Sequence, residues 1–480
     1  MCVIYIWSLM KSSTFTYSCK HLSNNIARIY INNSFSLDQF GYTAGTKLSL
    51  VCSKNCVLIE KSSSGSKSVI DTSRGSLIEL RSKDIAKSFH RITKVVVTVT
   101  GNLIEITPCP RELRQAQRIE SLYRAVCLGK GVKYGSLFAG IGLLSLNVIN
   151  GMADAGLKAV LQLANDKDPL ALSCSMEGNP IWDNASPDVI ASNLDVRELA
   201  LTDLPRVDIL EISWPCNNTS KLCPGDMRDL MHPIVGGLFT WIIVVIKRMN
   251  PSVILIENSK PFLKSETFSI FKRELADDYL FEETTVRGDV YGDFEPRERS
   301  CVVARDKSLP ESYIAELHPP VNVSHRKLSD ILEPITPNDK RWRKMEHVKK
   351  KINDKRLNFR NTVYTPDDTR IGSLMATYAS PKVGAPFLIH PSESEYQRHF
   401  TYVEHGRIRR APDSLMTVMD KVANGLHSLV RKTGNISAIH RMYGNSVSPL
   451  PWHAAGKSIG IWLTSLKELL CDFYKCNGTC

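Results

Sequence analysis

Residues 133–142 read KYGSLFAGIG, and this stretch decides the fold. A short apolar segment runs to Phe138 and is followed by closely spaced glycines, as expected where a strand turns sharply into a helix. Further short β-branched or apolar segments lie at residues 159–165, 191–196, 207–213, 253–257 and 301–304. Such segments alternating with helical stretches are typical of a parallel sheet covered on both faces. We therefore predict an α/β, Rossmann-like, mostly parallel sheet between about residues 130 and 306.

The apolar run 238–249 predicts a crossover helix, because Asn250-Pro251 would end it just before the strand that begins at Val253. In open α/β sheets, ligands bind beyond the carboxyl ends of the strands. The residues predicted to follow three of these strands are the glycine loop, Pro215-Cys216 and Glu257-Asn258. We therefore expect these residues to meet in one crevice.

Residues 1–110 predict a separate β-rich accessory domain. The pattern KLSLV at 47–51 followed by VLIE at 57–60 is similar to KVVV at 94–97 followed by LIE at 103–105, which indicates two similar hairpins. A connecting helix is expected over about residues 111–124. Beyond residue 306 the regular alternation of strands and helices fades.

The charge of the chain favours a polyanionic partner such as nucleic acid, since its net charge is +12 and its pI is near 9.0. Residues 340–360 contain ten Lys or Arg against two acids, so this stretch is either a solvated helical face or a phosphate contact. The 13 cysteines form no CxxC pair, which favours thiols in a reducing cytoplasm and no metal site. The apolar runs at 2–7 and 241–246 are too short to span a membrane.

Two aspartates indicate a nucleoside cofactor. Asp166 lies at the end of the second predicted strand and Asp195 ends the third, where a carboxylate can accept hydrogen bonds from ribose hydroxyls. This pattern fits either a dinucleotide or S-adenosylmethionine, and an acid at a strand end is also a common helix cap. Cys216 adds a nucleophile, because Pro215 stiffens the loop that presents the thiol, although an isolated cysteine is usually a packing residue.

Five motifs in order resemble the DNA cytosine-5 methyltransferase family, from Tyr134 to about Ile461. They are FAGIG at 138–142, WPCNNTS at 214–220, ENS at 257–259, EPRER at 295–299 and YGNSV at 443–447. The segment GRIRRAPD at 406–413 is loosely similar to a further motif. The sequence departs from the family pattern at Ser136, Leu143, Ile212-Ser213-Trp214, Asn217 and Glu295.

The resemblance implies a class I methyltransferase domain over residues 130–306 and 435–470, with a smaller target-recognition region at 307–434. It implies S-adenosyl-L-methionine as methyl donor and double-stranded DNA as substrate, with the target cytosine flipped out of the duplex. Cys216 would add to the base, Glu257 would hold ring nitrogen 3 and the amine, and Arg299 and Arg297 would hold the carbonyl oxygen or nearby groups. The implied cofactor residues are Phe138, Ala139, Gly140, Ile141, Gly142, Asp166, Asp195, Asn445 and Ser446.

Positive surroundings are expected to depress the pKa of the Cys216 thiol, and the cationic sulfonium of the cofactor and the nearby arginines would supply them. For both arginines, the alternative interpretation is a surface ion pair with Glu298 or Glu295. Other functions stay open: a catalytically weak DNA-binding relative, an RNA cytosine methyltransferase on the same scaffold, or a nicotinamide oxidoreductase that shares only the glycine loop and acidic strand ends. The resemblance implies a bacterial or phage-encoded protein that acts on DNA in the cytoplasm, with a cognate restriction endonuclease as one candidate partner.

Overall fold

The computed structural model describes residues 12–216, 225–346, 348, 350, 356, 362–380 and 384–475. The chain divides into two compact units, Met1–Gln117 and Arg118–Cys480. Each unit has its own hydrophobic core. Within the described ranges, no helix is long and apolar enough to cross a lipid bilayer.

The first unit is built on a nine-stranded antiparallel sheet with the order β5-β3-β4-β9-β8-β1-β2-β7-β6. The β-rich amino-terminal domain expected from the sequence is confirmed. Its strands are β1 (Ser13–Leu22), β2 (Ile26–Ile31), β3 (Lys47–Ser53), β4 (Cys56–Lys61), β5 (Lys67–Ser68), β6 (Ile70–Thr72), β7 (Gly75–Ser82), β8 (Lys94–Val99) and β9 (Leu103–Pro108).

This unit contains the same order of elements twice: a strand, a short helix and a hairpin. The first copy is β2, α2 (Ser34–Gln39), β3 and β4, and the second is β7, α3 (Lys83–Ser88), β8 and β9. The two helices begin alike, because the Asn33 and Ser82 side chains each accept a hydrogen bond of 3.1 Å from the amide three residues later. β2 pairs with β7 and β4 with β9, both antiparallel, as expected for two copies related by an approximate two-fold axis.

The second unit contains a seven-stranded sheet with the order β12-β11-β10-β13-β14-β16-β15. The first five strands are parallel and the last two are antiparallel to their neighbours, which confirms the mostly parallel α/β prediction. The strands are β10 (Val132–Leu137), β11 (Ala159–Asn165), β12 (Ala185–Ser192), β13 (Ile209–Ser213), β14 (Val253–Ser259), β15 (Tyr279–Arg287) and β16 (Glu298–Asp306).

Two edge strands differ from the prediction. The third strand, expected at 191–196, lies at Ala185–Ser192, and β15 was not predicted at all. Both edge strands are largely exposed, so the apolar alternation that identifies a half-buried strand is weak in their sequences. The prediction that Asp195 ends a strand was therefore wrong, and Asp195 instead caps a helix.

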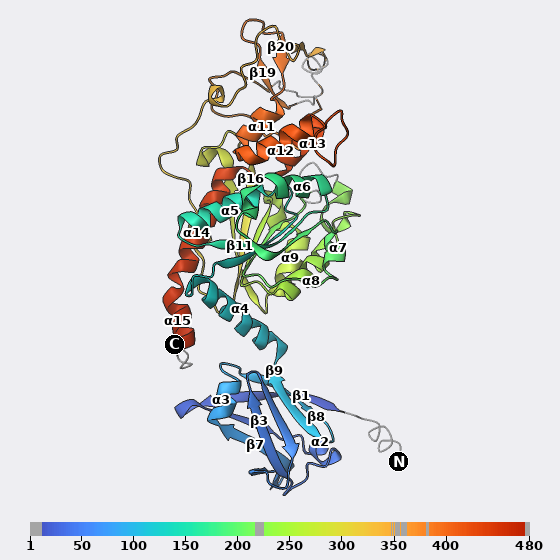
Figure 1. The fold of residues 1–480 in the computed structure, drawn as a ribbon, viewed down its shortest axis with the longest axis vertical. Coiled ribbons are helices and arrows are strands. Elements are labelled where there is room, and N and C mark those ends of the chain that lie inside the picture. The colour runs from blue at the N-terminus through green and yellow to red at the C-terminus, as the bar shows by residue number, and fades with distance from the viewer. Residues whose placement is uncertain are drawn as a thin grey trace. The chain divides into compact units, whose positions relative to one another are not determined.

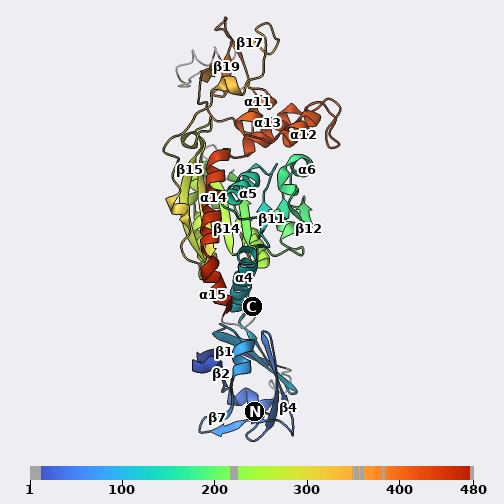
Figure 2. The same cartoon turned by 60° about the vertical axis from the view of Figure 1, so that its left-hand side comes forward.

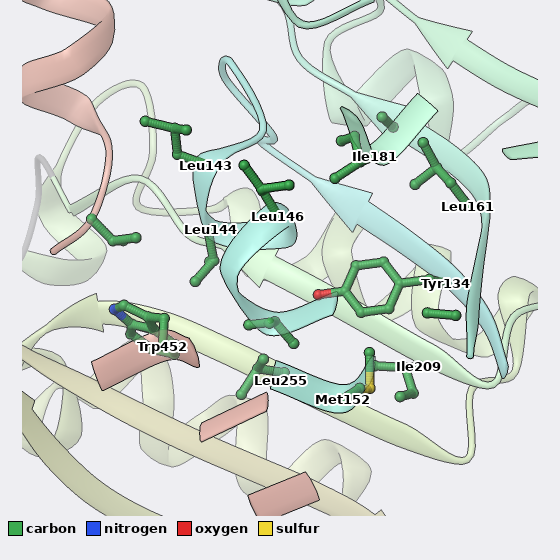
Figure 3. Close-up of a cluster of buried hydrophobic side chains, with 14 of the residues drawn as sticks. Tyr134, Leu143, Leu144, Leu146, Met152, Leu161, Ile181, Ile209, Leu255 and Trp452 are labelled. Carbon is green, nitrogen blue, oxygen red and sulfur yellow. The ribbon is translucent and has the colours of Figure 1, made fainter. Parts of the chain in front are cut away.

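Helices cover both faces of this sheet (Figures 1 and 2). One face packs against α5 (Leu143–Asp154), α6 (Pro169–Gly178) and α14 (Pro449–Ser465), and the other against α7 (Val196–Leu199), α8 (Leu238–Met249) and α9 (Glu266–Leu275). The crossover helix expected at 238–249 is thus confirmed as α8. Figure 3 shows Met152 of α5 and Trp452 of α14 in the core above the strands. α5 and α14 approach so closely that a Cβ on Gly151 would lie 2.0 Å from the His453 carbonyl oxygen.

The remaining elements follow β16 or precede β10. A small sheet has the order β17 (Arg343–Lys344), β20 (Tyr396–Arg398), β19 (Pro386–Ile389) and β18 (Thr362–Tyr364). After it come α11 (Tyr402–Ile408), α12 (Asp413–Ala423), α13 (Ile436–Asn445) and, beyond α14, α15 (Lys467–Lys475). α12 shares the core of the large sheet. Much of the basic stretch at 340–360 lies outside the described residues, and within its described part Arg341 and Lys344 pair with Asp339 and Glu395.

The connecting helix α4 (Pro110–Val126) carries a buried cation, Arg118, which is 2% exposed. Its Nε lies 2.5 Å from Asp306 Oδ2 at the end of β16, and its Nη1 donates to Asn250 Oδ1 at 2.9 Å. The ion pair therefore attaches α4 to the amino-terminal side of the sheet, where β14 begins and β16 ends.

We predict that Arg118→Ala lowers the free energy of unfolding of this unit by about 3 to 5 kcal/mol, because it leaves the Asp306 carboxylate buried without its cation. Arg124→Ala on the same helix removes only the exposed pair with Glu120 and should cost less than about 0.5 kcal/mol. Urea unfolding followed by circular dichroism measures both. Equal losses in the two variants would contradict a structural role for the buried pair.

Candidate active site

The carboxyl ends of β13 and β14 meet the amino-terminal end of the antiparallel strand β16 at the site. Ser213, the last residue of β13, lies opposite Glu257 of β14, and Ser259 of β14 lies opposite Arg299 of β16. The next residue along the chain, Trp214, continues the pairing, because its amide donates to the Glu257 carbonyl oxygen at 3.2 Å. The loop that carries Cys216 therefore leaves β13 directly beside Glu257.

Glu257 and Arg299 form an ion pair that is largely buried. Arg299 Nε lies 2.9 Å from Glu257 Oε1, with the side chains 15% and 10% exposed. Ser213 Oγ donates to the other carboxylate oxygen at 3.3 Å. Glu298 is not the partner of Arg299, since its carboxylate pairs with Lys260 at 2.8 Å. The Glu257 carboxylate is thus fixed in orientation from both sides.

Arg297 lies close to this pair and is only 7% exposed. Its Nη1 donates to the Gly444 carbonyl oxygen at 2.9 Å, and its Nε has no hydrogen-bond partner in the described part of the chain. Burial and the nearby Arg299 lower the pKa of this guanidinium to about 9. The surface ion pair considered for Arg297 was therefore wrong, and the residue instead connects the start of β16 to the YGNSV motif.

The Cys216 thiol lies in the field of all three of these groups. Burial raises its pKa, and the Glu257 carboxylate raises it further, while Arg299 and Arg297 lower it. Desolvation of the thiolate outweighs the two arginines, so these cations alone leave the pKa of the thiol raised, not depressed. The flanking Trp214 is 2% exposed, and its ring lies 5.2 Å from the rings of both Phe262 and Phe271, so it anchors the loop. Asn217 and the rest of WPCNNTS lie outside the described residues.

The glycine loop after β10 divides into an open part and a buried part. Phe138 and Gly140 have φ of 58° and 55°, and a Cβ on Gly140 would meet nothing within 4 Å. The Gly140 amide donates to Asp166 Oδ2 at 2.7 Å. Phe138, Ala139 and Gly140 are half-buried, whereas Ile141 and Gly142 are buried. Gly142 caps α5 at φ 76°, and a Cβ there would lie 2.7 Å from Asn179 Nδ2, so this glycine is required for packing.

The other predicted cofactor residues lie in different surroundings. Asp166 Oδ1 accepts from the Asp168 amide at 2.8 Å, and burial raises the pKa of the Asp166 carboxyl. Asp195 is the N-cap of α7, where its Oδ1 accepts from the Arg197 amide at 3.0 Å. Asn445 ends α13 and is exposed, and Ser446 Oγ donates to the Tyr443 carbonyl oxygen at 2.6 Å. Asp166 and the open part of the loop lie together, whereas Asp195, Asn445 and Ser446 lie on other segments and stay predicted contacts.

Glu211 is a buried acid that sequence reasoning missed. Its carboxylate accepts hydrogen bonds from Tyr134 at 2.5 Å, Ser136 at 2.8 Å and Ser145 at 2.9 Å. The residue is fully buried, and burial raises its pKa to about 7. Ser136 stands where the family usually has aspartate. In this chain the carboxylate belongs to Glu211 on the neighbouring strand β13, and Ser136 Oγ donates a hydrogen bond to it. A glutamate within the apolar run Ile209-Leu210-Glu211-Ile212 was the signal that could have identified it.

Glu295, the first residue of EPRER, forms a second buried network. Its carboxylate pairs with the Arg409 guanidinium, and both side chains are at most 1% exposed. The same carboxylate accepts from the Leu374 amide at 2.6 Å, and Arg409 Nε donates to the Tyr443 carbonyl oxygen at 3.0 Å. The loop before β16, the segment at 374 and the end of α11 are thereby held next to the YGNSV motif.

This arrangement can perform nucleophilic chemistry on a polar ring. A thiol, a fixed carboxylate and a guanidinium converge, and an open glycine loop with an aspartate lies at the end of a nearby parallel strand. Among the residues that the structure describes, no group of His, Cys, Asp and Glu could hold a metal ion.

Comparisons with known proteins identify a family and a fold. Residues 132–460 match the family model of the C-5 cytosine-specific DNA methylases. A structure of a Dnmt2 methyltransferase from S. pombe superposes with a TM-score of 0.51 at 18% identity, covering 70% of this chain and 99% of that one. A putative DNA modification methyltransferase encoded within an E. coli prophage gives a TM-score of 0.44 at 17% identity, covering 70% and 100%. No curated protein sequence matches.

We predict that the stability of the second unit depends on the ionisation of Glu211. Because burial raises its pKa to about 7 from about 4.5, the folded state keeps a proton that the unfolded state has released. The stabilisation is complete below about pH 4.5 and is lost as the pH rises to about 7. Glu211→Gln has no carboxyl group to ionise. The free energy of unfolding of the variant, relative to that of the wild type, should therefore rise by up to about 3 kcal/mol from pH 4.5 to pH 8.

Urea unfolding at pH 5, 6, 7 and 8 measures the difference between variant and wild type. Glu120→Gln on α4, whose carboxylate is partly exposed, is the matched control and should show no such trend. A constant difference between Glu211→Gln and the wild type across this range would mean that Glu211 is ionised throughout.

Proposed function

Because the chain belongs to the C-5 cytosine-specific DNA methylase family, we propose that it transfers a methyl group from S-adenosylmethionine to carbon 5 of cytosine in double-stranded DNA. The observation that carries the proposal is the Cys216 loop leaving β13 beside the Glu257–Arg299 ion pair. A nicotinamide oxidoreductase would use only the glycine loop and Asp166, so that function does not explain why the Glu257–Arg299 ion pair lies beside Cys216.

Cys216 makes carbon 5 reactive. In cytosine the ring electrons are delocalised, so carbon 5 attacks an electrophile poorly. The Cys216 thiol releases its proton to water and the thiolate adds to carbon 6: a C–S bond forms, the double bond between carbons 5 and 6 breaks, and ring nitrogen 3 takes up a proton. The product is an enamine whose carbon 5 is nucleophilic. Once carbon 5 carries the methyl group, water removes the carbon 5 proton, the C–S bond breaks and nitrogen 3 releases its proton, which restores the aromatic ring and the free thiolate.

Glu257 and Arg299 act on the opposite edge of the ring. Addition of the thiolate pushes charge onto the ring, and a carboxyl group at ring nitrogen 3 and the exocyclic amine meets that charge and identifies cytosine. Arg299 is a positioning residue for Glu257 through the 2.9 Å contact. Its guanidinium can also face the carbonyl oxygen of the base. Arg297 connects the site to the YGNSV motif through its hydrogen bond to the Gly444 carbonyl oxygen.

The glycine loop and Asp166 fit S-adenosylmethionine. Gly140 has open space where a Cβ would lie, and Asp166 holds the loop through the Gly140 amide while keeping lone pairs for two ribose hydroxyls. When bound there, S-adenosylmethionine supplies the electrophilic methyl group. Asp195, Asn445 and Ser446 stay predicted cofactor contacts, with one Asp195 oxygen already used in capping α7.

The nature of the nucleic acid is part of the proposal. A cytosine stacked in a duplex cannot reach Cys216, so the base would be flipped out, and residues 307–434 would contact the DNA that surrounds it. A cognate restriction endonuclease would suit a DNA enzyme of this kind. To test the substrate, the protein is mixed with radiolabelled S-adenosylmethionine and either duplex DNA or tRNA. Label in DNA supports the proposal, label in tRNA alone assigns the enzyme to RNA, and label in neither identifies a catalytically inactive relative.

We predict that Cys216→Ser abolishes methyl transfer and covalent trapping on DNA that contains 5-fluorocytosine, because no adduct at carbon 6 can form. Cys109→Ser, which changes another half-buried thiol outside this site, should keep both. Trapping by the Cys216→Ser variant would remove Cys216 from its role.

We predict that Glu257→Gln lowers kcat by about 10²- to 10³-fold, since the amide meets the developing charge less well. Lys260→Gln removes only the neighbouring exposed ion pair with Glu298 and should leave kcat unchanged. Single-turnover methylation with saturating DNA measures both variants. A Glu257→Gln enzyme of normal rate would exclude the carboxyl group from ring activation.

A further inference from the structure

The positive charge of the chain is concentrated in the first unit. The first unit, residues 1–117, contains 15 Lys or Arg and seven Asp or Glu, a net charge of +8 out of +12 for the whole chain. The active site lies entirely in the second unit, so catalysis gives no reason for this excess. A charge excess of this kind indicates a polyanionic partner for the first unit itself.

Three of these cations lie in one row across the sheet. Arg28 of β2 is directly opposite Arg81 of β7 on one side and Lys20 of β1 on the other. The inward-facing neighbours Cys19, Ala27, Ile29 and Leu80 are buried in the core, so the three cations share the outer face. Lys20 and Arg81 are exposed and Arg28 is half-buried. Neighbouring strands are about 4.8 Å apart, so the row spans about 10 Å. We call Lys20, Arg28 and Arg81 the cationic row.

The row is unfavourable for folding. Like charges directly opposite each other on neighbouring strands repel. None of the three forms an ion pair with a described residue, and the nearest acid on the same face is Glu79, opposite Tyr30. The Arg28 guanidinium lies over the Tyr30 ring at 4.6 Å, and Tyr30 is itself 39% exposed. A ligand with closely spaced negative charges would relieve this repulsion.

We propose that the cationic row binds the phosphate backbone of double-stranded DNA, which makes the first unit a DNA-binding module separate from the catalytic crevice. The inference rests on the proposed function for the choice of DNA among polyanions. Duplex DNA presents one negative charge per about 1.7 Å of its axis, so a row of about 10 Å meets several phosphates. The contacts are to the backbone and carry no base specificity by themselves.

The test uses the full chain with two matched double variants. Arg28→Gln/Arg81→Gln removes two charges from the row, and Lys47→Gln/Lys67→Gln removes two exposed charges on β3 and β5 at the other end of the strand order. Fluorescence anisotropy measures the affinity for a fluorescent duplex at several salt concentrations. We expect the row variant to bind about tenfold more weakly, with a slope of log K against log[salt] that is smaller by about 2, and the control to bind nearly as the wild type.

Stability and turnover separate this role from a structural one. The row variant should unfold at the same or a higher temperature than the wild type, because repulsion is removed, and should keep kcat at saturating DNA while KM for DNA rises. Equal affinity in the row variant and the wild type, equal weakening in both variants, or weakened binding of duplex RNA alone would overturn the inference. If the wild type shows no methylation activity but the row variant binds DNA more weakly than the wild type, DNA binding by the cationic row is supported and the proposed function is rejected. If the row variant binds DNA as tightly as the wild type and the wild type methylates DNA, the inference about the row is rejected and the proposed function is supported.

Discussion

The active site depends on the register of three adjacent strands. β13 pairs with β14 so that Ser213 is opposite Glu257, and β14 pairs with β16 so that Ser259 is opposite Arg299. A shift of one residue in either ladder would turn Glu257 or Arg299 to the other face of the sheet and separate the thiol from its acid. Register is fixed by the apolar residues of β14, every one of which is buried on both faces. The packing of the core thus determines where the polar groups meet.

The central part of the fold follows from sequence because its signals are strong. β11 and α8 were predicted with the observed bounds, since each is an apolar run ended by a clear break. The edge strands were misplaced or missed because the exposed sequences of β12 and β15 lack apolar alternation. At the site, motif order predicted roles for Cys216, Glu257 and Arg299, and the structure brings these residues together. The ionisation of the thiol depends on how far it is desolvated, and motif spacing carries no information on burial.

Buried charges were the hardest feature to foresee. Glu211, the Glu295–Arg409 pair and Arg118 with Asp306 join segments far apart in sequence, and each is satisfied only by the completed fold. The family pattern predicts an acid at position 136 of β10, where this chain has serine. The carboxylate at this place comes instead from Glu211 on β13, which can be recognised only once β10 and β13 are known to be neighbours. Such groups add little net stability by themselves, but a partner lost from any of them leaves an uncompensated charge.

The duplication within the first unit has a consequence for how such a surface can arise. With the helix caps Asn33 and Ser82 as equivalent positions, the counterpart of Arg28 is Leu77 and the counterpart of Arg81 is Asn32. The arginine pair is therefore present once and not twice. A homodimer built from one repeat would carry identical residues in both halves and could not place a cation pair on one side alone. Two repeats within one polypeptide can differ in sequence, so this nearly symmetric scaffold can carry a cation pair on one side only.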